Sequence, residues 1–398
     1  MIYESIHIFF LLVFIYTAVN LLYLFIASIA GYFYQNRSYS AFPVKKRIAV
    51  LITSFKEDEV IVNTAYQASV HKYADFDVYL AADQLQLSTM EALYRLKINT
   101  VPVVFKNGSK ARSLNYLLNY INEADYDIAV VLDGDNIMDA GFLEKINTSF
   151  HRNYKAVQGH RTAKNKNTPV ALLDAISEEI NNHLFRQAQR VFGFSSSTIG
   201  SGMAFEFSKL KEIYNKPGIL DNPACDREVD FEMMKSGIVV EYIRNAYVYD
   251  EKVSGQKVYQ TQRMRWMESQ VIHLRLFLTK KVPNKTKDYW NKLFINLIPP
   301  RILFIGLFGV LFFIYLLQYF IHTSIIGIPF TAWLILLLVY VSTMLLSIPR
   351  SLYSLQSLKA LLYLPVLLFA LLSALAGMKS SRKEFIHTPK SFTGKDIL

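Results

Sequence analysis

The stretch AVVLDGDNIM, residues 129–138, decides the fold of this chain. Its first half is a continuous apolar run, which is typical of a strand buried on both faces of a sheet. The run stops at Asp133-Gly134-Asp135, so two carboxylates follow the strand one residue apart. Ligands of open parallel sheets bind beyond the carboxyl ends of the strands. The stretch therefore predicts a buried strand that delivers two acidic side chains to the ligand-binding edge of a sheet.

Short apolar runs and helix-length segments alternate along the chain before this stretch. We expect strands at 47–53, 77–82, 101–105 and 127–132, and helices at 58–73, 88–98 and 111–124. Such alternation is typical of a parallel sheet covered by helices on both faces. The predicted fold class is therefore α/β.

Polar side chains follow each of these predicted strands. They are Thr53, Ser54 and Glu57 after the first strand, Asp83 after the second, Lys110 after the third, and Asp133 and Asp135 after the fourth. The Rossmann glycine fingerprint and the P-loop pattern are both missing from the sequence. Two carboxylates beside a flexible glycine suit Mg²⁺ or Mn²⁺, bound together with substrate phosphates. Taken alone, however, the D-x-D pattern is a weak signal and fits a solvated turn better than a metal site.

Two later segments strengthen the metal-site interpretation. QRMRW, residues 262–266, combines two cations with an indole ring, which suits a diphosphate and a sugar. The same residues also fit an amphipathic helix at the membrane surface, and the two interpretations are compatible. In ACDREVDFEMMKSG, residues 224–237, Asp226 is either a general base or an acidic residue that favours a helix N-terminus.

The hydrophobic segments predict a membrane protein. Residues 8–30 carry no charge over a length that spans a bilayer, and further apolar runs lie at 302–321, 328–348 and 360–377. The net charge of +11 gathers beside these runs, which fits the positive-inside rule and a cytoplasmic polar block better than nucleic-acid binding. The single cysteine, Cys225, excludes an intrachain disulfide. One span before the block and three after it would place the basic tail outside, so either one C-terminal segment is re-entrant or interfacial, or the count is wrong by one.

The order of these motifs resembles the membrane-embedded family 2 glycosyltransferases, such as cellulose, hyaluronan, chitin and poly-N-acetylglucosamine synthases. The resemblance rests on VLITSFKEDEVI (50–61), Asp83, KARSLN (110–115), DGD (133–135), GSGMAF (200–205), Asp226 and QRMRW. It covers about residues 45–270. The family's Thr-Glu-Asp is Ala224-Cys225-Asp226 here, which bears on acceptor identity more than on catalysis.

The resemblance implies a GT-A fold, a Rossmann-like mixed sheet, with assigned roles for the residues. Thr53, Glu57, Asp83, Lys110, Asp133 and Asp135 would bind the nucleotide-sugar, expected to be a UDP-sugar; Asp133 and Asp135 would also hold Mg²⁺ or Mn²⁺. Arg263 and Arg265 would offset charge on the departing nucleotide, with Asp226 as base. Gly202, Gln262 and Trp266 would bind the acceptor. The expected parts are an N-terminal transmembrane helix (1–36), a GT-A domain (37–270), interfacial amphipathic helices (271–300), about three C-terminal transmembrane helices (301–378) and a basic tail (379–398).

Three functions follow from this reading. The first is processive, inverting transfer to a growing β-linked polysaccharide at the membrane, which is the plasma membrane if the source is bacterial. The second is non-processive transfer of one sugar to a membrane lipid. A transporter or a catalytically silent scaffold is the third, which the charge-poor C-terminal spans and the intact acidic set disfavour. Expected partners are the donor, a glycan or lipid acceptor and membrane lipid, with no nucleic acid; partner subunits of a secretion path stay open.

Overall fold

A computed structural model describes residues 2–35, 42–106, 108–220, 225–282, 285–378 and 390–392 of the chain. One mixed sheet of eight strands forms the centre of the catalytic block, in the order β3-β2-β1-β4-β7-β6-β8-β5. The strands are β1 (Ile48–Phe55), β2 (Phe76–Asp83), β3 (Asn99–Val103), β4 (Ile128–Asp133), β5 (Ile137–Met138), β6 (Ala156–Ala163), β7 (Met203–Glu206) and β8 (Val240–Asp250). The four strands expected from the sequence are confirmed as β1 to β4, and they are parallel to one another. The other half of the sheet is mixed, because β7 runs antiparallel to both β4 and β6.

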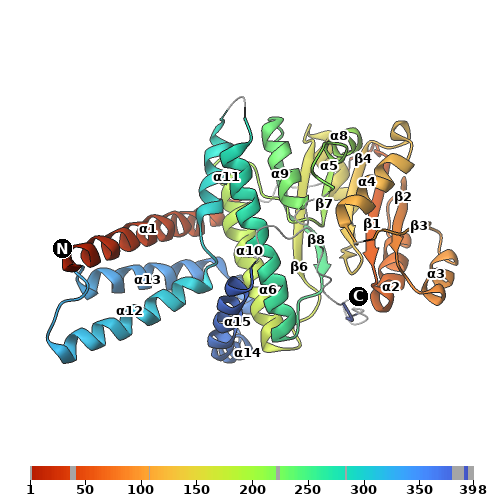
Figure 1. Cartoon of the computed structure of the whole chain (residues 1–398). Coiled ribbons are helices and arrows are strands. Elements are labelled where there is room, and N and C mark those ends of the chain that lie inside the picture. Colours follow the sequence, from red (N-terminus) through yellow and green to blue (C-terminus); the bar gives the residue numbers. More distant parts are fainter. Residues whose placement is uncertain are drawn as a thin grey trace.

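Helices cover both faces of this sheet and continue into a separate bundle (Figure 1). Their bounds are α1 (Ile2–Ala30), α2 (Asp58–Ser69), α3 (Leu87–Tyr94), α4 (Lys110–Tyr120), α5 (Phe142–His151), α6 (Pro169–Asn182), α7 (Ala188–Val191), α8 (Phe207–Tyr214), α9 (Cys225–Lys235), α10 (Gln256–Thr279), α11 (Lys287–Leu297), α12 (Ile302–Ile321), α13 (Phe330–Ser347), α14 (Leu355–Ala360) and α15 (Leu364–Ala376). The three helices expected at 58–73, 88–98 and 111–124 are present as α2, α3 and α4, each ending several residues earlier than expected.

The apolar run of each central strand is buried on both faces. In β1, Ala49 and Leu51 pack in one core cluster with α4, α8 and α9, whereas Ile48, Val50 and Ile52 pack in the other with α2, α3 and α5. Because successive side chains of a strand point to opposite faces, a strand without polar alternation needs helices on both sides. The register pairs Thr53 with Asp133, so the ends of β1 and β4 lie at one edge of the sheet.

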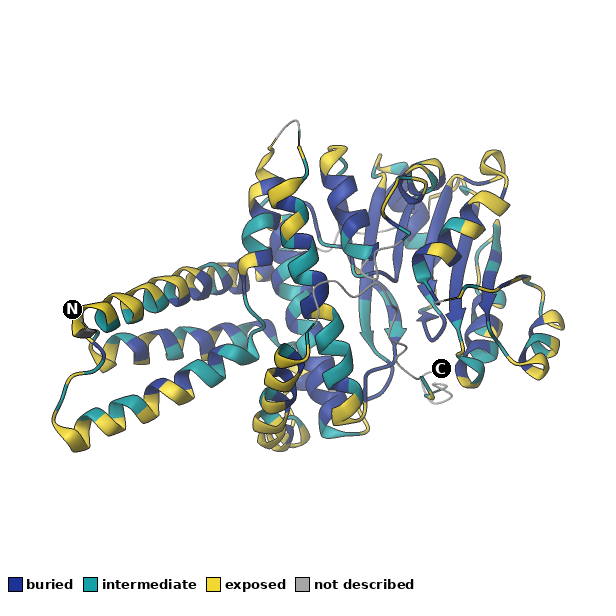
Figure 2. Ribbon diagram, in the orientation of Figure 1, coloured by how far each residue is buried: buried dark blue, intermediate teal, exposed yellow. Residues whose placement is uncertain are grey.

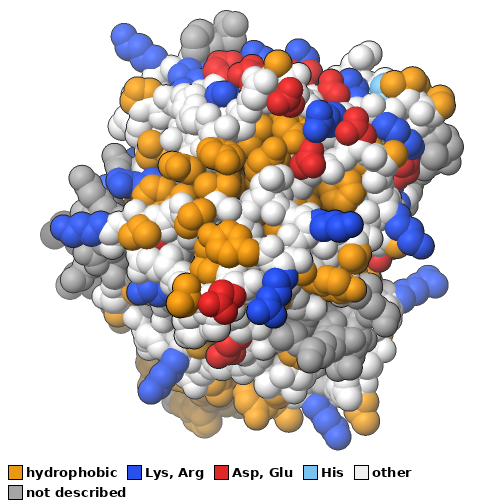
Figure 3. Space-filling model, turned by 90° about the vertical axis from the view of Figure 1, so that its right-hand side faces the viewer, with side chains coloured by type: hydrophobic (Ala, Val, Ile, Leu, Met, Phe, Trp, Pro, Cys, Tyr) orange, Lys and Arg blue, Asp and Glu red, His pale blue; other side chains and the backbone are white. Residues whose placement is uncertain are grey.

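Four helices are long and apolar enough to cross a membrane, judged by length and composition: Tyr3–Phe33, Ile302–Ile321, Phe330–Ser347 and Leu355–Ala376. Figure 1 shows α1, α12 and α13 side by side, projecting from one side of the catalytic block, while α14 and α15 lie against α6 and α10. Figure 2 shows that the projecting helices carry many exposed positions, and these include the large apolar residues Phe9, Leu12, Phe313 and Leu338. Lipid would cover such surfaces. The end of the block turned away from the bundle carries acidic and basic side chains interspersed with apolar patches (Figure 3).

The boundary expected at residue 270 falls inside a helix. QRMRW lies on α10, which runs without a break from Gln256 to Thr279 and packs along α15. The motif and the first part of the segment expected to be interfacial, residues 271–279, therefore lie on one continuous helix, and α11 is a separate helix. Of the basic tail expected at 379–398, the structure describes only Lys390, Ser391 and Phe392.

Candidate functional site

A cavity of about 560 Å³ lies where the strand ends meet α9, α10 and the first residues of α12. Ten of the twelve residues expected at the site line it: Thr53, Glu57, Lys110, Asp133, Asp135, Asp226, Gln262, Arg263, Arg265 and Trp266. These residues come from segments up to about 200 positions apart in the sequence. The fold thus gathers the motifs at one place.

The backbone at Gly134 explains why the D-x-D motif carries a glycine. A Cβ atom at this position would lie 2.0 Å from Oε2 of Glu57, so no larger residue fits without moving that carboxyl group. Asp135 is 1% exposed, and its Oδ2 accepts a hydrogen bond from the backbone N–H of Glu251 at 2.7 Å. Asp133 forms an ion pair with Lys110, whose Nζ also donates to the carbonyl oxygen of Gly200 at 2.7 Å. The motif is thus held in place on several sides, which a solvated turn is not.

Three carboxyl groups crowd together at this edge of the sheet. Burial raises the pKa of Glu57 to about 8, and the charges of Asp135 and Asp133 add to the shift. Lys110 beside Asp133 and Lys390 beside Asp135 balance part of this negative charge, so a divalent cation at the two aspartates would compete with these lysines. Within the described residues no set of three His, Cys, Asp or Glu side chains is arranged to hold a metal ion, so a divalent cation at Asp133 and Asp135 would take further oxygen ligands from donor phosphates.

We expect Glu57→Gln to change the pH dependence of stability. The wild-type carboxyl group has a raised pKa in the folded state, so its stabilising contribution is present below about pH 4.5 and is lost as the pH rises towards about 8. In EDTA, the difference between the melting temperature of the variant and that of the wild type should therefore be a few degrees more positive at pH 9 than at pH 5. Adding Mn²⁺ and UDP should reduce the gap, and a gap that is the same at both pH values would contradict this electrostatic account.

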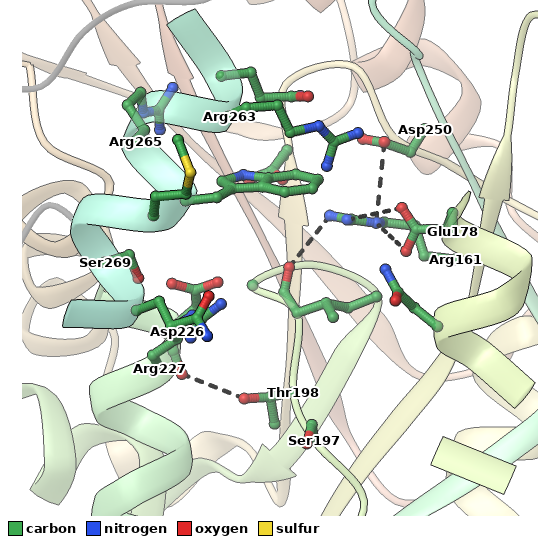
Figure 4. A pocket seen from close by; sticks show the side chains of 18 of the residues that line it. Arg161, Glu178, Ser197, Thr198, Asp226, Arg227, Asp250, Arg263, Arg265 and Ser269 are labelled. Carbon is green, nitrogen blue, oxygen red and sulfur yellow. Dashed lines mark hydrogen bonds and ion pairs between the residues drawn. The ribbon is translucent and has the colours of Figure 1, made fainter. Parts of the chain in front are cut away.

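Asp226 lies in the first turn of α9 and lines the same cavity as the D-x-D motif; Figure 4 shows it beside Arg227. Gly200, with φ +86°, allows close approach here, since a Cβ atom on it would lie 3.3 Å from Oδ2 of Asp226. The hydroxyl group of Thr198 donates to the backbone oxygen of Asp226 at 3.3 Å. These contacts position the loop and the carboxylate relative to one another.

The two arginines of QRMRW have different surroundings. Burial lowers the pKa of Arg265, while the charges of Asp226 and Asp133 oppose that shift, so Arg265 is within electrostatic reach of both carboxylates. Arg263 instead forms an ion pair with Asp174 of α6, and its guanidinium lies 4.0 Å from the ring centroid of Trp266. Arg265 is therefore better placed than Arg263 to act on the donor, which the sequence alone could not decide.

Two expected residues lie outside the cavity lining. Asp83 is fully buried at the end of β2, where its Oδ1 accepts from the backbone N–H of Phe105 at 3.3 Å. Gly202 directly precedes β7, where its N–H donates to the oxygen of Val131 and its oxygen accepts from the N–H of Gly159. The wall position that we expected for Gly202 is taken by Gly200, two residues earlier.

A buried network of charged side chains also lines the cavity, and the sequence did not predict it. Lys252 Nζ lies 2.8 Å from both Glu178 and Asp250, and Arg161 donates to Glu178 at 3.0 Å and to the oxygen of Ile199 at 3.2 Å (Figure 4). One signal was available: Asp174 and Glu178 are four residues apart in a helical segment, which places both on one face. Lys390, whose Nζ lies 3.1 Å from Asp135 Oδ2, gave no signal, since 255 positions separate the two residues.

The fold and the site define an α/β protein of GT-A type with apolar helices attached. The family model described as "Glycosyltransferase like family 2" matches residues 46–269, more than half of the chain. The chain belongs to this family.

Curated relatives share about half of their length or less with this chain. A poly-beta-1,6-N-acetyl-D-glucosamine synthase of Staphylococcus aureus (strain COL) is 24% identical over 171 residues, which are 42% of this chain and 41% of the relative. The protein of the same name from Staphylococcus epidermidis is 24% identical over 222 residues, 52% of each chain. Among solved structures, the mannosyltransferase PcManGT from Pyrobaculum calidifontis, in complex with GDP-Man and Mn²⁺, has a TM-score of 0.54 at 13% identity and covers 94% of this chain and 98% of its own. That likeness supports the fold alone.

Proposed function

We propose that this chain transfers a sugar, with inversion, from a UDP-sugar to an acceptor hydroxyl group at a membrane, its catalytic block lying in the cytoplasm. The observation that carries the proposal is that Asp133, Asp135 and Asp226 line one cavity although they come from the end of β4 and the start of α9. Donor-binding and proton-accepting groups thus face one space, which is what a direct displacement needs.

The proposed reaction is a single displacement. The acceptor oxygen forms a bond to the anomeric carbon, the bond from that carbon to the diphosphate breaks, and Asp226 takes the hydroxyl proton. Arg265 offsets the negative charge on the departing nucleotide. Asp133 and Asp135 would hold Mg²⁺ or Mn²⁺, which supplies further charge compensation at the diphosphate. Attack from the face opposite the leaving group gives a β-linkage from an α-linked donor.

Two acceptors fit this chemistry. A growing β-linked polysaccharide is favoured by the similarity to the two staphylococcal synthases and by the intact QRMRW on the cavity wall. A membrane lipid that receives a single sugar is favoured by the extent of the cavity. Among the described lining residues, only Ile302 comes from α1, α12 or α13, so the cavity stops where the bundle begins.

A product assay tests the proposal and separates the two acceptors. Membranes that contain the chain are incubated with a panel of radiolabelled UDP-sugars, with Mg²⁺, Mn²⁺ or EDTA. We expect metal-dependent incorporation from one donor, either into material of high molecular mass or into lipid carrying one or two sugars. Incorporation that is unchanged in EDTA, or no incorporation from any nucleotide-sugar, would contradict the proposal.

A further inference from the structure

Arg301 lines the cavity where it meets the apolar helices. It directly precedes α12, and its guanidinium donates to Asn181 Oδ1 at 2.6 Å and to the backbone and side-chain oxygens of Ser177 at 3.1 Å. Within the described part of the chain, its recorded partners are all neutral oxygen atoms. Arg161 and Arg263 in the same cavity are each paired with a carboxylate. Arg301 is therefore a cation whose counter-charge the described residues do not supply.

The surroundings make that positive charge costly. Burial lowers the pKa of Arg301 to about 10, and the nearby charge of Arg263 acts in the same direction. An enclosed cation without a counter-charge loses hydration that neutral partners only partly replace. An anionic ligand group would remove this cost. A guanidinium presents a planar fork of donors that matches phosphate oxygens, and the N-terminus of α12 directly beyond it adds favourable potential.

Unpartnered polar atoms lie in the same cavity. Nε of Arg263 and Oε1 of Gln262 are buried without a hydrogen-bond partner, and both residues belong to the cavity lining. They offer one donor and one acceptor for further polar groups of a ligand. A ligand that binds here would thus meet a hydrogen-bonding wall on the α10 side.

The wall next to Arg301 is apolar. Its members are Ile298, Pro299, Pro300, Ile302 and Leu371, which come from the segment before α12, from α12 itself and from α15. An anionic group held by Arg301 would therefore continue into an aliphatic chain that lies along helices apolar enough to meet lipid. A small soluble anion would leave this wall unused.

We propose that Arg301 forms an anion subsite that binds the phosphate group of a lipid-linked acceptor and holds it at the membrane end of the catalytic cavity. The inference rests on the proposed function and names its acceptor class. It is compatible with both acceptors above, because the attacking hydroxyl group can belong to a head group or to a glycan that the lipid phosphate carries, so that the phosphate is held at Arg301 while the hydroxyl group gives its proton to Asp226. Gln262 and Arg263 would then face the acceptor's polar groups closer to Asp226.

Binding measurements on the full chain in detergent test the subsite. The ligands are farnesyl phosphate, farnesol and inorganic phosphate, titrated into the wild type and into Arg301→Gln, Arg301→Lys and Arg350→Gln. Arg350 is the matched control, an exposed arginine that follows α13 and lies outside the cavity lining. UDP with Mn²⁺ is titrated in parallel to report on the donor half of the cavity in each variant.

We expect farnesyl phosphate to bind the wild type and Arg350→Gln alike, and Arg301→Gln about 10- to 100-fold more weakly, as for loss of one charge-assisted pair. Arg301→Lys should fall between them, because it keeps the charge and loses the fork. Equal farnesyl phosphate affinity in the wild type and Arg301→Gln, with UDP binding intact in both, would overturn the subsite while leaving the proposed function standing. Inorganic phosphate that binds as tightly as farnesyl phosphate would overturn the lipid source. Failure of UDP to bind even the wild type would instead count against the proposed function.

Discussion

Asp226→Asn should reduce sugar transfer by about 10²- to 10⁴-fold, the usual contribution of a general base. The amide has the shape of the carboxylate but cannot accept the hydroxyl proton at neutral pH. The Thr198 contact is made to the backbone oxygen of residue 226 and does not depend on the side chain. UDP affinity should therefore stay within about threefold of the wild type, so that the loss falls on the chemical step. Initial rates under saturating donor and calorimetric titration of UDP with Mn²⁺ give the two numbers.

The matched control for this variant is Asp58→Asn. Asp58 also lies in the first turn of a helix, α2, and is absent from the cavity lining. If Asp226 served only as a negative charge at the helix N-terminus, each variant would lose about 0.3–1 kcal/mol of folding stability. The two variants would then transfer sugar at similar rates. A parallel fall in transfer and in UDP affinity for Asp226→Asn would remove Asp226 from the role of base and assign it to donor binding.

The second large effect is expected at the D-x-D motif. Asp135→Asn should weaken UDP binding in the presence of Mn²⁺ by about 100-fold or more and abolish detectable transfer, because a neutral amide is a poor ligand for a hard divalent cation. The fold should tolerate the change, since an amide oxygen can still accept the N–H of Glu251 that Asp135 now accepts at 2.7 Å. Electron paramagnetic resonance of Mn²⁺ titrated with protein and UDP measures the metal directly, independently of activity.

Asp139→Asn serves as the control for Asp135→Asn. Asp139 follows the same motif by a few residues but does not line the cavity, so its substitution should leave Mn²⁺ binding unchanged. Full transfer activity of Asp135→Asn at wild-type metal concentrations would mean that Asp135 does not hold a metal that the reaction needs.

The sequence predicted the half of the sheet whose strands are continuous apolar runs. The runs that form β1 to β4 are short, rich in β-branched residues and separated by helix-length segments, so their pattern and spacing are enough to predict these strands. The strands β6 and β8 carry polar residues such as Gln158, Arg161 and Glu241 in the sheet itself, whereas β5 and β7 are only two and four residues long. Those side chains are buried through partners far away in sequence, which no local pattern records.

In the candidate site, too, some residues could be placed from the sequence and others could not. Residues that directly follow the first strands, such as Asp133 and Asp135, could be placed because a strand end has a defined edge. The sequence did not show which way side chains on helices point. Arg263 and Arg265 are only two positions apart, yet Arg263 pairs with Asp174, whereas Arg265 interacts electrostatically with Asp226. In the sequence Arg301 is only the residue before an apolar run, because its neutral partners Ser177 and Asn181 come from a distant helix.

The ion pair between Lys390 and Asp135 has a consequence for how the chain is threaded through a bilayer. Lys390 follows α15, the last apolar helix that the structure describes, and still reaches the carboxylates of the cavity, where the backbone N–H groups of Ser391 and Phe392 also donate to Glu251. A polypeptide that must come back to its own catalytic centre can cross the lipid only an even number of times after leaving it. We infer that α12 and α13 form one outward and return pair, and that α15 rests in the leaflet nearest the catalytic block.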